Sequence, residues 1–147
     1  MKQLLLCVTV FLNTVNSLSA QKSAVFEKSD RAIRAYDPVA YFTEGRPVQG
    51  KEEFVYNWNN ASWYFSSQQN LNLFKTNPQK YAPQYGGYCA YGLSNGYKAS
   101  TVPEAWTIVN GKLYLNYSLK IRDTWEKNRA EWIEKADKNW PQIKDKE

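Results

Sequence analysis

The chain has 147 residues and contains no histidine. The lack of an imidazole excludes a Ser-His-Asp triad, a Cys-His dyad, a His-ligated haem and every His-containing zinc site. The 19 Lys and Arg residues against 14 Asp and Glu give a formal charge of +5, spread along the chain without a long basic block, so we expect no nucleic-acid partner. A hydrophobic fraction of 43% is enough to build one core at this length.

The first twenty residues have the pattern of a signal peptide. A short positive start, Met1-Lys2, precedes an apolar run from Leu4 to Leu12 that is too short to span a membrane. Small residues end the segment just before Gln21, which predicts cleavage after Ala20. We therefore expect an exported protein, periplasmic or secreted, with no stable membrane span after cleavage; a retained anchor is the alternative. Cleavage would leave Cys89 as the only cysteine, so no intramolecular disulfide would form.

Residues 21–34 are polar and predict a flexible arm, followed by one folded domain over residues 35–141 and a polar tail over 142–147. Within the domain, residues 36–42 predict a turn that enters a strand, because Pro38 pushes Asp37 towards an extended conformation. Residues 54–66 are aromatic and β-branched at both ends and turn-forming in the middle, at 59–61. This pattern predicts a β-hairpin.

The next segments alternate between helix and loop signals. Ser67 is placed to cap a short helix that runs through Phe74, and Asn77-Pro78 favours the start of another turn of helix. Residues 81–99 form a long segment rich in Gly, Tyr and Ser, within which residues 86–92 predict a loop. The segment 106–115 predicts a second hairpin, because Asn110-Gly111 supplies the positive φ angles of a two-residue turn.

The last predicted element is an amphipathic helix from Ser118 to about Asn139, stopped by Pro141. Four apolar side chains form one stripe, which favours a surface helix held against the sheet by its tryptophans. They are Ile121, Trp125, Trp132 and Ala136. The predicted fold class is therefore α+β, a small single domain of β-hairpins with a short central helix and a C-terminal amphipathic helix.

Several of these segments, in this order, resemble the YHS domain. In that family an Asp-Pro-Val-Cys turn precedes a Tyr-Tyr-Phe-Cys-Ser strand end, followed by a helix with a further Cys and an Asn-Pro-x-x-Tyr segment. The resemblance covers roughly residues 36–81 and implies a small α+β fold. It rests on Asp37-Pro38-Val39, Trp63-Tyr64-Phe65-Ser66-Ser67, Phe74 and Asn77-Pro78-Gln79-Lys80-Tyr81.

The cysteines of the metal-binding members are missing. Their positions hold Ala40, Ser66 and Asn70 in this chain. A methyl group, a hydroxyl and an amide offer little to the soft or borderline metals that thiolates attract. The resemblance therefore implies the fold without the family's thiolate metal site.

Cys89 lies in the glycine-rich segment from Gly86 to Gly92 and leaves three interpretations open. It would be a thiolate ligand for a soft metal such as copper, with Asp37 or a tyrosine as partner, or a redox-reactive thiol beside a cation. The third interpretation is an inert thiol that packs as a small hydrophobe.

The aromatic residues, 6 Trp and 11 Tyr among them, favour either core packing or a cleft for a flat organic ligand or a sugar. Trp58 and Trp63 flank the first predicted hairpin turn and Trp106 begins the second hairpin, so the exposure of these three would distinguish a cleft from core packing. We therefore expect an exported, non-catalytic module that binds a small molecule or a metal ion; the alternative is a copper-type or redox protein that uses Cys89. The candidate ligand-binding residues are Tyr36, Asp37, Tyr88, Cys89, Tyr91 and Trp106, and the candidate metal ligand is Cys89.

Overall fold

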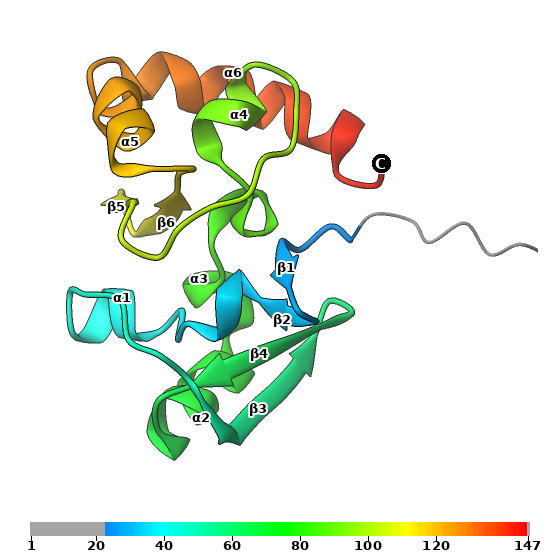
Figure 1. Ribbon diagram of the computed structural model, residues 1–147, viewed down its shortest axis with the longest axis vertical. Coiled ribbons are helices and arrows are strands. Elements are labelled where there is room, and N and C mark those ends of the chain that lie inside the picture. The colour runs from blue at the N-terminus through cyan, green and yellow to red at the C-terminus, as the bar shows by residue number, and fades with distance from the viewer. Residues whose placement is uncertain (1–22, 147) are drawn as a thin grey trace, which may run out of the picture.

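A computed structural model describes residues 23–146, so the predicted signal peptide and its cleavage site lie outside the described residues. The described chain forms two tiers (Figure 1). The first tier, residues 31–82, holds the first hairpin and helices α1 to α3; the second tier, residues 84–143, holds the second hairpin and the C-terminal helices. The elements are β1 Glu27–Lys28, β2 Arg31–Ala32, η1 Ile33–Ala35, α1 Ala40–Thr43, β3 Lys51–Trp58, β4 Ala61–Phe65, α2 Gln68–Thr76, α3 Pro78–Tyr81, η2 Gln84–Gly87, α4 Ala90–Ser94, β5 Trp106–Val109, β6 Lys112–Leu115, α5 Leu119–Glu126 and α6 Arg129–Ile143.

Both predicted hairpins are confirmed. Strands β3 and β4 pair antiparallel across a turn at Asn59 and Asn60, whose φ angles are 54° and 58°. Strands β5 and β6 pair across Asn110 and Gly111, with φ angles of 50° and 73°. Positive φ at both turn residues matches the right-handed twist of the flanking strands. With helices between and after these hairpins, the fold class is α+β as predicted.

The three predicted helix caps are also confirmed. Ser67 Oγ accepts a hydrogen bond from Asn70 N at 3.1 Å and begins α2. Asn77 Oδ1 accepts from Lys80 N and begins α3, with Pro at the first helical position. Ser118 Oγ accepts from Ile121 N at 3.2 Å and begins α5. Each side chain satisfies one of the backbone N–H groups that a helix start leaves unpaired.

Strand β6 divides the core in two. Leu113 and Leu115 face the first-tier cluster, which also holds Trp63 and Phe74, whereas Tyr114 faces the second-tier cluster around Trp125. Successive side chains of a strand point to opposite faces, so one four-residue strand carries buried residues on both sides. The tiers are therefore built on a common strand.

Two predictions at the start of the domain differ from the structure. In the described part of residues 21–34, Val25, Ala32 and Ile33 are buried in the core and the chain forms β1 and β2, so this part is packed rather than a flexible arm. Residues 36–42 do not enter a strand. Ala40–Thr43 form α1, because the Asp37 side chain caps the segment and Pro38 suits the first helical turn.

Two later predictions also differ. The predicted loop over residues 86–92 overlaps the end of η2 and the start of α4, which pack against β6 and α6. The single C-terminal helix is two helices, separated where Asn128 leaves helical geometry. Pro141 lies inside α6 instead of ending it. Trp140 and Ile143 pack against the second-tier cluster, which holds the last helical turn in place beyond the proline.

The chain makes two tight left-handed turns that touch each other. Ile33, Arg34 and Ala35 have φ angles of 41° to 61°, and Tyr85, Gly86 and Gly87 have φ angles of 56° to 87°. A Cβ added to Gly87 would lie 2.4 Å from Ile33 Cγ2, so this approach requires glycine. Left-handed backbone costs an L-residue roughly 1–2 kcal/mol, and burial of Ile33 and Ala35 in the core stabilises the turn against that cost.

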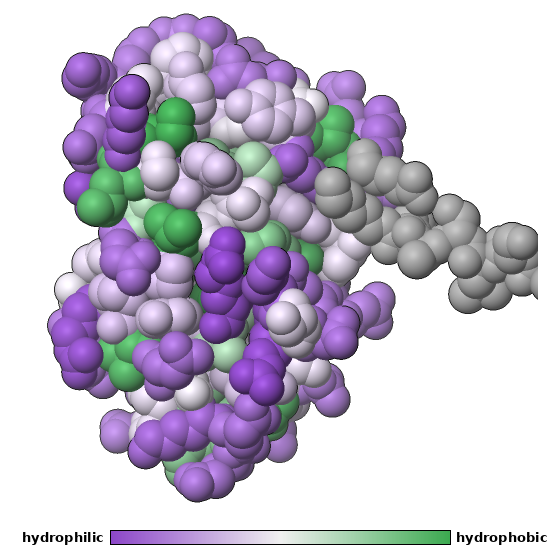
Figure 2. All heavy atoms as spheres, viewed as in Figure 1, coloured by the Kyte–Doolittle hydropathy of each residue, from purple (hydrophilic) through white to green (hydrophobic). Residues whose placement is uncertain are grey.

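Hydrophilic residues cover most of the face shown in Figure 2, and hydrophobic residues appear there only as separate patches. The large hydrophobic residues that are exposed are Val55, Tyr97, Tyr117 and Leu119. Among residues 23–146, none of the helices combines the length and the apolar character needed to span a membrane.

Candidate functional site

The residues at the family's cysteine positions meet at one place. We call the group formed by Asp37, Ala40, Ser66 and Asn70 the Asp37 corner. Asp37 lies between η1 and α1, Ser66 directly follows β4, and Asn70 lies on the first turn of α2. The hairpin brings the end of β4 back to the start of α1, so residues about thirty positions apart in the sequence become neighbours.

The carboxylate of Asp37 is fully buried and accepts five hydrogen bonds. Oδ1 accepts from the backbone N–H groups of Val39 at 2.8 Å and Ala40 at 3.3 Å. Oδ2 accepts from Ser66 N at 2.8 Å, from Ser66 Oγ at 2.7 Å and from Asn70 Nδ2 at 2.7 Å. A buried carboxylate is tolerated when donors surround it in this way, and the corner ties α1, β4 and α2 together.

This arrangement does not fit the thiolate metal site that the resemblance implies. Ser66 and Asn70 direct their donors at Asp37, and Ala40 contributes only its backbone N–H. Among residues 23–146, no three Asp, Glu or Cys side chains come together as a group that could hold a metal ion. At the positions where the metal-binding members have thiolates, the corner therefore holds a methyl group and two side chains that donate to the Asp37 carboxylate.

A polar cavity of about 500 Å³ lies next to this corner, and we call it the corner cavity. Ser66 and Asn70 form part of its wall. Because Asn70 Nδ2 is held by Asp37, the amide orientation is fixed and Oδ1 is left as an acceptor. The other lining residues are Thr43, Glu44, Val48, Gln49, Lys51, Ser67, Gln69 and Leu73.

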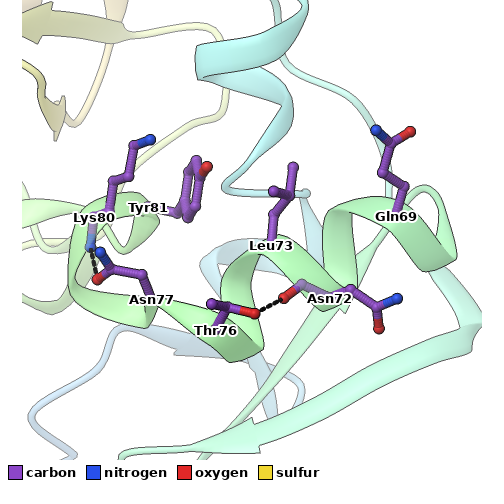
Figure 3. Close-up of a pocket in the computed structure, with 7 residues that line it drawn as sticks. All are labelled: Gln69, Asn72, Leu73, Thr76, Asn77, Lys80 and Tyr81. Atoms are coloured by element: carbon purple, nitrogen blue, oxygen red, sulfur yellow. Dashed lines mark hydrogen bonds between the residues drawn. The ribbon is translucent and has the colours of Figure 1, made fainter.

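A second cavity, of about 590 Å³, follows α2 and α3 and shares Gln69 and Leu73 with the corner cavity. Figure 3 shows Leu73 and Tyr81 pointing to the same side of the two helices, with Gln69 and Lys80 at the ends. Its polar groups are used locally: Thr76 Oγ1 donates to Asn72 O, and Asn77 caps α3. We therefore regard the corner cavity, whose wall includes the Asp37 partners, as the better candidate site.

Cys89 lies in the second tier and is only 2% exposed. Its Sγ accepts hydrogen bonds from Gly92 N at 3.4 Å and Tyr117 N at 3.3 Å, and lies 3.5 Å from Asn116 Oδ1. Burial raises the pKa of the thiol, and the backbone N–H groups lower it by less. A neutral thiol is a poor nucleophile and a poor metal ligand, so this environment favours a structural role.

The other predicted site residues do not gather around Cys89 and Asp37 as one site. Tyr91 is linked to Cys89 through Asn116, whose Oδ1 accepts from Tyr91 N at 3.1 Å. Tyr88 is buried and donates its hydroxyl to Ser23 O. Trp106 packs on Tyr41, and the Tyr36 backbone bridges to Gln49. Asp37 belongs to the first tier and Cys89 to the second.

Sequence reasoning missed the role of Ser66 and Asn70 as partners of Asp37. A signal was present, because Asp37-Pro38 has the same cap-and-proline pattern that correctly placed α3 at Asn77-Pro78. An Asp that caps α1 keeps one carboxylate oxygen for other donors. Asn116 had no such signal, since its contacts with residues 89–91 depend on tertiary packing.

One of three comparisons with known proteins agrees with the resemblance. Neither the curated proteins nor the solved structures contain a match to this chain. The family model of the YHS domain matches residues 39–85, a segment that begins within the Asp37 corner and ends where the second tier begins. The match therefore agrees with the resemblance over residues 39–85, and the rest of the chain lies outside the family model.

Proposed function

We propose that this protein is an exported, non-catalytic binding module that holds a small polar organic molecule in the corner cavity. The observation that carries the proposal is the double use of Ser66 and Asn70. Both residues bind the buried Asp37 carboxylate, and both form part of the cavity wall. At the position where the metal-binding members offer thiolates, this chain offers hydroxyl and amide groups held in fixed orientations.

The chemistry of the wall favours a polar ligand. Gln49 supplies an amide, Thr43 a hydroxyl and Lys51 an ammonium group, and Glu44 adds a carboxylate that pairs with Arg46. A volume of about 500 Å³ lies within the range of small-molecule sites, roughly 300–1,000 Å³. Groups of both charges together with neutral hydrogen-bonding groups suit a small molecule with several polar substituents better than a bare metal ion.

The alternative function, capture of a soft metal by Cys89, has weaker support. Metal binding needs the thiolate, whereas burial raises the pKa of this thiol. The sulfur is also enclosed by the backbone N–H groups of Gly92 and Tyr117. Export is proposed from the signal-peptide pattern of residues 1–20 alone.

The test is native mass spectrometry of the protein purified from its own compartment. We expect a small organic molecule to be retained by the unmodified protein. The double variant Gln49→Ala/Lys51→Ala should lose it, because both residues line the corner cavity, and the control Lys120→Ala on α5 should keep it. A stoichiometric copper or zinc adduct that is lost when Cys89 is replaced by Ser would contradict the proposal.

A further inference from the structure

A separate cavity of about 440 Å³ lies where the two tiers meet, and we call it the junction cavity. Four parts of the chain enclose it: the turn of the first hairpin, the segment from α3 to η2, the start of β6 and helix α6. The residues that matter for its chemistry are Trp58, Asn59, Gln79, Gln84, Lys112 and Trp140. It lies apart from the corner cavity, since the two share no lining residue.

Two half-buried tryptophans form aromatic walls of this cavity. Trp58 is fixed by ring contacts with Trp63, at 6.0 Å between centroids, and with Phe74, at 5.7 Å. Trp140 is fixed by Tyr85 at 6.1 Å and Tyr88 at 6.4 Å. Rings held by buried neighbours lose little conformational entropy when a ligand packs on them.

Four polar side chains that line the cavity are not used by the fold. Within residues 23–146, the side chains of Asn59, Gln79, Gln84 and Lys112 have no hydrogen bond or ion pair. Three of the four are amides, each of which offers both donors and an acceptor. In the cavity along α2 and α3, by contrast, Asn72, Thr76 and Asn77 form hydrogen bonds within their own helices.

We propose that the junction cavity binds a neutral carbohydrate, with a pyranose ring packed on Trp58 or Trp140. The apolar C–H face of a sugar ring matches an aromatic wall, and neighbouring hydroxyls match the paired donor and acceptor of an amide. Among the described residues that line the cavity there is no carboxylate, and Lys112 is the one cationic side chain. This balance favours a neutral polyhydroxylated ligand over a cation or a multiply charged anion.

The test is binding to an array of neutral mono- and oligosaccharides, followed by NMR titration of the best binder with the indole N–H signals as readout. Binding should shift the signals of Trp58 or Trp140. The double variant Gln79→Ala/Gln84→Ala should weaken binding at least tenfold, because both side chains are outside the core and their removal leaves the fold intact. Gln142→Ala, an exposed glutamine of α6 outside the cavity, is the matched control and should bind normally.

Two further arms make the outcome decisive. Monosaccharide binding identifies a free sugar as the ligand, whereas binding confined to oligosaccharides identifies a glycan chain; either supports the proposal. The corner variant Gln49→Ala/Lys51→Ala should bind the sugar normally. Sugar binding at the junction cavity is therefore tested independently of ligand binding in the corner cavity. No saccharide binding, binding unaffected by Gln79→Ala/Gln84→Ala, or preference for a flat aromatic compound over every sugar would overturn the proposal.

Discussion

Both tiers bury polar side chains. The first tier contains the Asp37 corner, and the second contains Cys89 and Asn116. In the first tier the Asp37 carboxylate is surrounded by five donated hydrogen bonds. In the second tier, among the described residues, Asn116 Nδ2 is buried without a hydrogen-bond partner, and so are the indole N–H groups of Trp125 and Trp132.

The two tiers differ in how completely their buried polar groups are paired. A paired buried polar group fixes the geometry of the elements that it joins, whereas an unpaired donor costs about 1–3 kcal/mol. Apolar contact stabilises both tiers, since Trp63 and Phe74 in the first and Trp125 and Leu93 in the second are fully buried. Perturbing buried hydrogen bonds should therefore damage the first tier more than the second.

The largest effect is expected from Asp37→Ala. The substitution leaves the donors of Ser66 and Asn70 buried without their acceptor, and we expect a loss on the order of 3–5 kcal/mol in the free energy of unfolding. Ser66→Ala, which removes one donor, should cost less. Urea denaturation measures both, with the exposed Glu53→Ala as control. Equal stability of Asp37→Ala and the control would show that the corner does not hold the first tier together.

A smaller loss is expected from Cys89→Ser in the second tier. The shorter hydroxyl has to replace the contacts of the sulfur with Gly92, Asn116 and Tyr117 in a nearly dry position, which should cost about 1–3 kcal/mol. In the unmodified protein a thiol reagent should react slowly until unfolding, because burial raises the pKa of Cys89. Fast labelling of the native protein that Cu(I) suppresses would favour the copper-handling alternative.

Alkaline pH should destabilise both tiers through buried tyrosines. Burial raises the pKa of Tyr41 in the first tier, and burial together with the hydrogen bond to Asp137 raises that of Tyr85 in the second. The folded protein therefore holds these protons more tightly than the unfolded chain, whose tyrosines titrate near pH 10. Their stabilising contribution is complete below about pH 10 and falls as the pH rises further.

Urea denaturation of Tyr85→Phe at several pH values tests this account. The variant loses the hydrogen bond to Asp137, worth about 1 kcal/mol, but its stability should fall less steeply above about pH 10. An unchanged slope would show that Tyr85 does not contribute to the alkaline transition.

The smallest effect is expected from a substitution that makes the turn between β3 and β4 resemble the turn between β5 and β6. Asn60 has a φ of 58° at the position where the second hairpin has Gly111. Asn60→Gly should stabilise the first hairpin by a few tenths of a kcal/mol, because glycine adopts this conformation without steric cost. A lower thermal midpoint for the variant would contradict this.

The local elements were largely predictable, because hairpin turns and helix caps depend on a few neighbouring residues. The second hairpin turn is specified directly by Asn110-Gly111, and the starts of α2 and α5 are specified by Ser67 and Ser118. The left-handed turn at Ile33–Ala35 could not be predicted, since none of its three residue types favours positive φ and the contacts that hold it, such as the approach of Ile33 to Gly87, are tertiary. The Asp37 corner was predictable only in part, because its bonds to Ser66 and Asn70 arise from pairing of distant segments.

The most direct test of the central claim is the thermal midpoint before and after exhaustive chelation under reducing conditions. If hydrogen bonds to Asp37 hold residues 39–85 together without a metal, the thermal midpoint should not change after chelation. Structural metal sites contribute their binding energy to folding. A large fall after chelation, restored by adding zinc or copper, would show that a metal holds this fold together and would contradict the account.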